Sequence, residues 1–227
     1  MKYIILLVTV ALVCSCSSTP QTQPFSVDLN SPRFDAGSAE AYFNKSFSIT
    51  GKLRKDALTV YYYPLDDAVC LQFRIDFVHC NQFWDREGRD AFVKAFERYQ
   101  EEYEQRKLAK KSNRKTREVY GEVQGFFTWK KTSIGVQAHG YPKIRLGYQF
   151  NDQSVFFTTT QMESYYEDPN SRSRNETSAI TEIYFTRAQA ESLIALFKQE
   201  HLQSLWTPPG GAGGKAEAET DKDKDKY

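Results

Sequence analysis

Apolar and polar residues alternate along most of the first half of the chain, which is typical of β-strands. The alternation predicts one strand over 47–53 and another over 58–63, with a charged turn at 54–56 between them. After a second turn at 64–67, every second residue is again apolar, which predicts a continuous strand over 70–80. This part of the chain therefore reads as successive short strands.

The period of the apolar positions then changes from two to that of a helix. Four aromatic residues are spaced 4, 3 and 4 positions apart and so lie on one side of a helix predicted over 86–110: Phe92, Phe96, Tyr99 and Tyr103. Asp85 is placed to cap the start of this helix. Glu102 is placed to pair with Arg106 one turn later.

Alternation returns in the second half of the chain. It predicts further strands over 119–129, 134–138, 144–150, 155–160 and 180–185. Gly121 and Gly125 interrupt the first of these, where we expect them to relieve crowding or to allow a β-bulge. A polar loop over 167–176 precedes the last strand.

The final element is a helix predicted over 187–204. Thr186 and Gln189 have the spacing of a capping box, and Pro208 follows the helix. Strands, a helix, more strands and a second helix, joined by short connections, favour antiparallel pairing. We therefore predict an α+β fold, in which a curved antiparallel sheet is covered by one or two helices.

The N-terminus has a different pattern, with Lys2 followed by an apolar run over 4–13. The run is too short to cross a bilayer, which takes about 20 residues, and is typical of a secretory signal. The sequence Val13-Cys14-Ser15-Cys16 resembles the lipobox of bacterial lipoproteins, in which an apolar residue and two small residues precede the modified cysteine.

That resemblance implies cleavage before Cys16 and attachment of acyl chains to Cys16, which would anchor the protein in a membrane of the bacterial envelope, facing the periplasm or the exterior. Residues 1–15 would then be the signal peptide and 16–24 a flexible tether. The alternative is an ordinary signal peptide cut before an unmodified cysteine.

At the other end, residues 207–227 contain a glycine cluster and alternating Asp and Lys, with no apolar spacing to bury. We expect a disordered tail there, and a single domain over 25–206. The 227 residues carry 30 Lys and Arg against 29 Asp and Glu, so no basic excess indicates a nucleic-acid partner.

Two further cysteines, Cys70 and Cys80, flank the predicted strand over 70–80. If that strand is continuous, their sulfur atoms lie about 30 Å apart, whereas a disulfide needs Cα atoms within about 7 Å. We therefore predict two free thiols. The alternative is that the chain folds back between them.

No catalytic, metal-binding or cofactor-binding motif is present. His79, His139 and His201 have none of the spacings of metal ligands. Asp76, His79 and Cys80 resemble a list of acid, base and nucleophile, but neighbours on one strand point to opposite faces and cannot converge. The sequence thus predicts neither a metal nor a cofactor. An enzyme would need titratable groups gathered near His139 or Asp76.

A basic segment follows the first predicted helix. Residues 105–117 contain no acid and seven basic residues: Arg106, Lys107, Lys110, Lys111, Arg114, Lys115 and Arg117. One interpretation is a solvated helix end, where cations are favoured by the helix dipole. The other is a contact with anionic lipid headgroups or an anionic polymer, to which each cation contributes about 1 kcal/mol.

Together these features predict a non-enzymatic binding or assembly module on the bacterial envelope. Its expected partners are the membrane, through the lipid anchor, and an anionic lipid or an envelope protein. Because 15% of the residues are aromatic, the alternative is a carrier that holds a small molecule or lipid in an aromatic-lined pocket. An enzyme is the third hypothesis.

Overall fold

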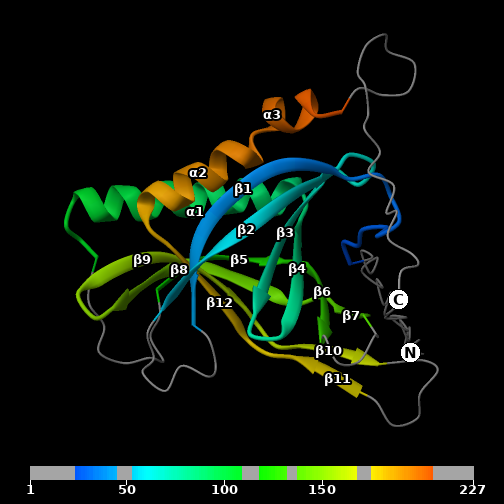
Figure 1. Ribbon diagram of the computed structural model, residues 1–227. Helices are drawn as coiled ribbons and strands as arrows, with labels where there is room; N and C mark the ends of the chain where they lie inside the picture. The colour runs from blue at the N-terminus through cyan, green and yellow to red at the C-terminus, as the bar shows by residue number, and fades with distance from the viewer. Residues whose placement is uncertain (1–23, 45–52, 109–117, 132–136, 168–174, 207–227) are drawn as a thin grey trace, which may run out of the picture.

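The computed structural model describes residues 24–44, 53–108, 118–131, 137–167 and 175–206. It confirms the α+β fold: a curled antiparallel sheet with helices packed along its inner face (Figure 1). The predicted signal peptide, the predicted tail and most of the strand expected over 47–53 lie outside the described residues.

The first seven strands are β1 (Phe34–Phe43), β2 (Arg54–Tyr63), β3 (Ala68–Ile75), β4 (Val78–Trp84), β5 (Glu118–Gln124), β6 (Phe126–Lys131) and β7 (Gln137–Gly140). The others in the described residues are β8 (Lys143–Asn151), β9 (Ser154–Gln161), β10 (Ser164–Glu167), β11 (Asn175–Ser178) and β12 (Thr181–Phe185). The helices there are α1 (Arg86–Glu104), α2 (Arg187–Phe197) and α3 (Gln199–Ser204). One sheet has the order β5-β8-β9-β12-β1-β2-β3-β4-β6-β7, and β10 pairs with β11 separately.

The single strand predicted over 119–129 is two strands, with Gly125 between them. β5 forms one edge of the sheet, whereas β6 lies beside the opposite edge strand, β7. One residue separates β5 from β6, so the sheet must curl until its two ends meet at Gly125. Gly121 follows a shift in the register of β5 against β8, which confirms the expected bulge.

We predict that Gly125→Ala destabilises the protein, because a Cβ at this position would lie 2.5 Å from Ile144 Cδ1. The expected loss is about 1–3 kcal/mol of unfolding free energy, as for other overpacked sites, measured by urea denaturation. The matched control is Gly121→Ala, whose Cβ would have no heavy atom within 4 Å. Equal stability of the two variants would contradict this account of how the sheet closes.

The start of α1 confirms the prediction, but its end does not. Asp85 caps the helix, accepting a hydrogen bond from the Gly88 N–H at 2.7 Å. The helix ends at Glu104 because Arg106 adopts a left-handed conformation with φ of 53°. The N–H of Lys107 then donates back into the last turn, an arrangement known as a Schellman motif. The prediction that this helix extends to residue 110 is therefore wrong.

The helix predicted over 187–204 is also interrupted. The capping box is confirmed, because Thr186 and Gln189 exchange hydrogen bonds between side chain and backbone. Lys198 has an extended ψ of 129°, which separates α2 from α3. Both helices end before Pro208, as predicted.

The chain turns back within the strand predicted over 70–80. Ile75 pairs with Val78, and the two residues between them form the turn of a β3–β4 hairpin, with Asp76 at φ of 52°. The charged turn predicted at 54–56 is likewise wrong, because these residues are the start of β2 and pair with β1.

The two thiols are nevertheless free, as predicted, although the distance argument behind the prediction was wrong. Cys70 pairs with Phe83 across the hairpin and Cys80 pairs with Phe73. Their side chains consequently point to opposite faces of the sheet, and both are buried.

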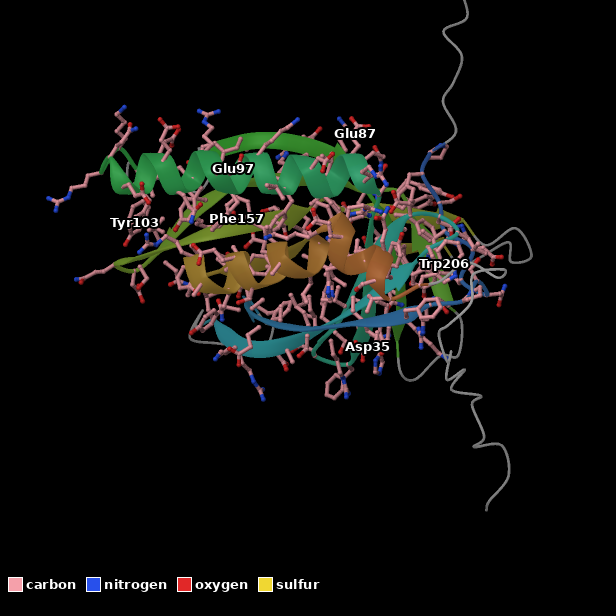
Figure 2. The ribbon with its side chains drawn as sticks, turned by 90° about the horizontal axis from the view of Figure 1, so that it is seen from above. Asp35, Glu87, Glu97, Tyr103, Phe157 and Trp206 are labelled. Carbon is pink, nitrogen blue, oxygen red and sulfur yellow. The ribbon has the colours of Figure 1, made fainter. Side chains whose placement is uncertain are left out.

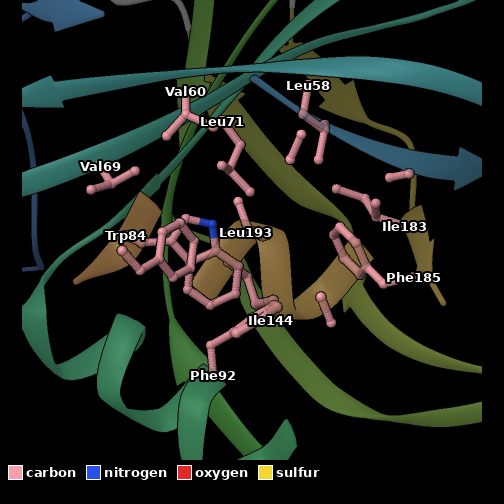
Figure 3. Close-up of a cluster of buried hydrophobic side chains, with 14 of the residues drawn as sticks. Leu58, Val60, Val69, Leu71, Trp84, Phe92, Ile144, Ile183, Phe185 and Leu193 are labelled. Carbon is pink, nitrogen blue, oxygen red and sulfur yellow. The ribbon is translucent and has the colours of Figure 1, made fainter. Parts of the chain in front are cut away.

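The main core lies between the inner face of the sheet and the helices (Figure 3). Phe92 of α1 is at its centre, with ring centroids 5.8 Å from Trp84, 5.1 Å from Phe157, 6.0 Å from Phe185 and 5.4 Å from Phe197. The last of these residues belongs to α2, so the contact joins the two helices, which lie side by side in Figure 2.

A second, smaller cluster lies on the outer face of the sheet. It is formed by Tyr63, Ala68, Cys70, Phe83 and Phe126, with the N-terminal residues Phe25 and Val27 packed against it. The N-terminal segment is thereby held on the outer side of β2, β3, β4 and β6.

Candidate functional site

The structure describes only residues 105–108 of the basic segment, which include two of its seven basic residues. Arg106 and Lys107 are exposed and lie directly after α1. The other predicted contacts lie outside the described residues: Lys110, Lys111, Arg114, Lys115 and Arg117. The predicted lipidation site, Cys16, also lies outside them.

Cations and tyrosines from three other elements flank this point. Arg98 of α1 stacks on the ring of Tyr120 in β5, with 4.6 Å between the guanidinium carbon and the ring centroid. Arg187 of α2 stacks in the same way on Tyr103, at 4.2 Å. We call this surface the α1 tip, and it consists of Arg98, Tyr103, Arg106, Lys107, Tyr120 and Arg187. Such stacking orients a guanidinium over the face of a ring.

Glu102 contacts two members of the α1 tip. The predicted pairing of Glu102 with Arg106 is wrong. Glu102 instead pairs with Arg98 at 3.0 Å and accepts a hydrogen bond from the Tyr120 hydroxyl at 2.7 Å. The Tyr120 hydroxyl, and then Arg98, hold the pKa of Glu102 below its ordinary value. Burial and this carboxylate raise the pKa of Tyr120. At neutral pH the carboxylate is therefore ionised and engaged within the protein.

The α1 tip and the N-terminal segment lie at opposite ends of the molecule. α1 begins beside the β2–β3 turn, where Arg86 donates to Asp67 Oδ2 at 2.8 Å. Figures 1 and 2 both show the described N-terminal residues, in blue, at this end, and Figure 2 labels Tyr103 at the other. The 19 residues of α1 span about 28 Å at 1.5 Å per residue, which is the scale of the separation.

The groups considered for catalysis do not converge. His79 and Cys80 point to opposite faces of β4, and Asp76 lies in the hairpin turn. Burial raises the pKa of the Cys80 thiol to about 12, so it stays protonated. His139 lies on the outer face, with its ring centroid 6.0 Å from that of Phe126. Within the ranges described, no three His, Cys, Asp or Glu side chains gather as metal ligands.

An ion pair between the buried Arg89 and the partly exposed Asp67 lies at the end of α1 that is remote from the tip. Arg89 donates to Asp67 Oδ1 at 3.0 Å, to the Asp67 carbonyl at 2.7 Å and to Gln199 Oε1 at 3.1 Å. A longer bond joins it to the Trp84 carbonyl at 3.3 Å. These contacts join the β2–β3 turn, α1 and α3, so we assign the pair a structural role.

Sequence reasoning missed most of the α1 tip. Arg98, Tyr120 and Arg187 come from α1, β5 and α2, and no local pattern in the sequence relates them. The only available signal was the basic segment itself.

Comparison with known proteins gives a family but no activity. A family model described as "Uncharacterised Treponema protein" matches residues 34–204, from the first residue of β1 to the last of α3. The chain belongs to this family. No curated protein and no solved structure matches it.

The family is bacterial, consistent with the bacterial setting that the lipobox resemblance implies. Across the described ranges, every helix falls short of the length and apolar character that crossing a membrane requires.

Proposed function

We propose that this protein is a lipoprotein of the bacterial envelope, anchored through Cys16, whose α1 tip binds an acidic surface of an envelope protein. It acts by binding or assembly rather than by catalysis. The observation that carries the proposal is the position of the tip. Its exposed cations lie at the end of the molecule opposite the N-terminal segment, so a protein held at its N-terminus can present them away from the anchor.

The charge along α1 favours a protein partner over the anchoring membrane. The exposed acids of α1 outnumber its exposed bases: Glu87, Asp90, Glu97, Glu101 and Glu104 against Arg86, Lys94 and Arg98. To reach the lipids of the anchoring membrane with its tip, the protein would have to lie with α1 along the anionic leaflet. That orientation would also bring these acidic side chains close to the anionic lipids. Because like charges repel, the tip is better placed for a partner beyond the membrane surface.

The packing of the interior around Phe92 favours a protein that acts through its surface. The aromatic residues that suggested a carrier pocket largely contact one another around Phe92. The buried Arg89 uses its polar atoms in hydrogen bonds within the protein.

Two variants of the anchored protein test the proposal in cells. Cys16→Ala should move the protein from the membrane fraction to the soluble fraction after cleavage of the signal, because the acyl chains are its anchor. Neutralising Arg106 and Lys107 to Gln should leave it in the membrane fraction but reduce cross-linking to its partner protein about tenfold, as expected if each lost cation costs about 0.7 kcal/mol.

The control for the second variant is Lys94→Gln, which removes an exposed cation from the flank of α1. It should cross-link like the wild type. Retention of the Cys16→Ala protein in membranes, with its signal peptide cleaved, would refute the anchor. The wild-type domain is also tested for binding to vesicles of anionic phosphatidylglycerol. If it binds them and the Arg106 and Lys107 variant does not, the partner of the α1 tip is a lipid and the proposed protein partner is wrong.

A further inference from the structure

The inner face of the sheet becomes polar towards β10 and β11 while remaining buried. Five residues on this face form what we call the polar belt: Gln82, Trp129, Thr159, Gln161 and Thr181. All are buried, and the sheet register places each beside residues of the main core or beside another member of the belt. Glutamine and threonine at such positions are unusual, since fully buried side chains are mostly apolar.

The belt crosses the interior from one wall of the curled sheet to the other. Gln82 of β4 donates through Nε2 to Gln161 Oε1 of β9 at 3.0 Å. Trp84 donates through its indole N–H to Gln82 Oε1 at 3.2 Å. The two glutamines belong to strands that are far apart in the sheet order, so their side chains meet across the space that the sheet encloses.

Three polar atoms of the belt have no hydrogen-bond partner among the described residues: Trp129 Nε1, Thr159 Oγ1 and Gln161 Nε2. A buried polar atom without a partner costs about 1–3 kcal/mol, and proteins leave few of them. Three in one region therefore call for a common explanation.

The register places these atoms around one region. Thr159 and Gln161 are two residues apart on the same face of β9. On β6, Trp129 lies opposite Cys80, which makes it the diagonal neighbour of Gln82, at about 7–8 Å between Cα atoms. Since Gln82 contacts Gln161, Trp129 and Thr159 are both neighbours of the glutamine pair on the inner face of the sheet.

We propose that the polar belt binds a small uncharged molecule through a carbonyl or hydroxyl oxygen. That oxygen accepts hydrogen bonds from Trp129 Nε1 and Gln161 Nε2, and Thr159 supplies a hydroxyl to a second polar group of the guest. The guest is uncharged because the belt contains no charged side chain, and a buried ion without a partner is strongly disfavoured. This site is separate from the α1 tip and independent of the anchor.

The test is a titration of the ¹⁵N-labelled full chain with N-methylacetamide, which offers a carbonyl, and with glycerol, which offers hydroxyls. We expect a saturable shift of the Trp129 indole N–H and of the Gln161 side-chain amide with at least one probe. The Trp129 signal is assigned by its loss in Trp129→Phe. The indole of Trp206, outside the belt, should not move.

The matched variant is Thr159→Val, which keeps the side-chain shape and removes one unpaired hydroxyl. It should weaken binding of the shifting probe about tenfold, the effect of one lost hydrogen bond. The proposal would be overturned if neither probe produced a saturable shift and the Trp129 indole N–H contacted only water. Unchanged probe affinity in Thr159→Val would also overturn it, whatever the outcome at the α1 tip.

Discussion

Asp67→Asn is expected to lower the unfolding free energy by about 3 kcal/mol, the cost of leaving the buried Arg89 charge without its partner. The Arg89 side chain is 3% exposed and cannot recover its hydration when the Asp67 charge is lost. Asparagine has the same shape as aspartate and tolerates the left-handed conformation of residue 67, where φ is 46°. The loss therefore reports on charge rather than on the turn, and urea denaturation at neutral pH measures it.

Arg86→Gln is the matched control, because Arg86 pairs with the other oxygen of Asp67 but its side chain is 60% exposed. Exposed ion pairs contribute about 0–1 kcal/mol, so this variant should unfold close to the wild type. If both variants lost the same unfolding free energy, the interaction of Asp67 with the buried Arg89 would contribute no more to stability than its interaction with the exposed Arg86.

Local patterns correctly predicted the elements whose determinants lie close together in the sequence. Asp85 caps α1, and Thr186 with Gln189 caps α2, because a cap depends on residues three positions apart. The β8–β9 hairpin was predicted from alternation on both sides of a polar turn, which Asp152 makes with φ of 55°.

Failures of prediction occurred where the chain turns without glycine or proline. Asp76 and Phe77 form the β3–β4 turn, and the alternation of apolar residues continues through it, so the sequence resembles one strand. Arg106 ends α1 in a left-handed conformation that glycine or asparagine usually provides. In each case a residue other than glycine adopts the left-handed conformation, so the local sequence carries little trace of the turn.

The polar belt could not be predicted for a related reason. Gln82 and Gln161 are glutamines, and this residue type is mostly exposed in folded proteins. Only the curling of the sheet, which joins β5 to β6 at Gly125, encloses them. Which face of a strand is inside depends on the closure of the whole sheet.

Phe92→Ala is the second variant with a large expected effect, because this ring joins both helices to the sheet. Phe92 is fully buried and contacts the rings of Trp84, Phe157, Phe185 and Phe197. Truncation of a buried phenylalanine costs about 3–5 kcal/mol, since the transfer free energy is lost and a cavity remains. Thermal and urea unfolding of the variant should both show the loss.

The matched control is Phe77→Ala at the tip of the β3–β4 hairpin, where the ring is 66% exposed. It should change the unfolding free energy by less than about 0.5 kcal/mol, as expected for a surface substitution. If Phe92→Ala unfolded like this control, the helices could not depend on the aromatic core for their attachment to the sheet. A large loss confined to Phe92→Ala would instead show that the aromatic interior holds the helices and the sheet together.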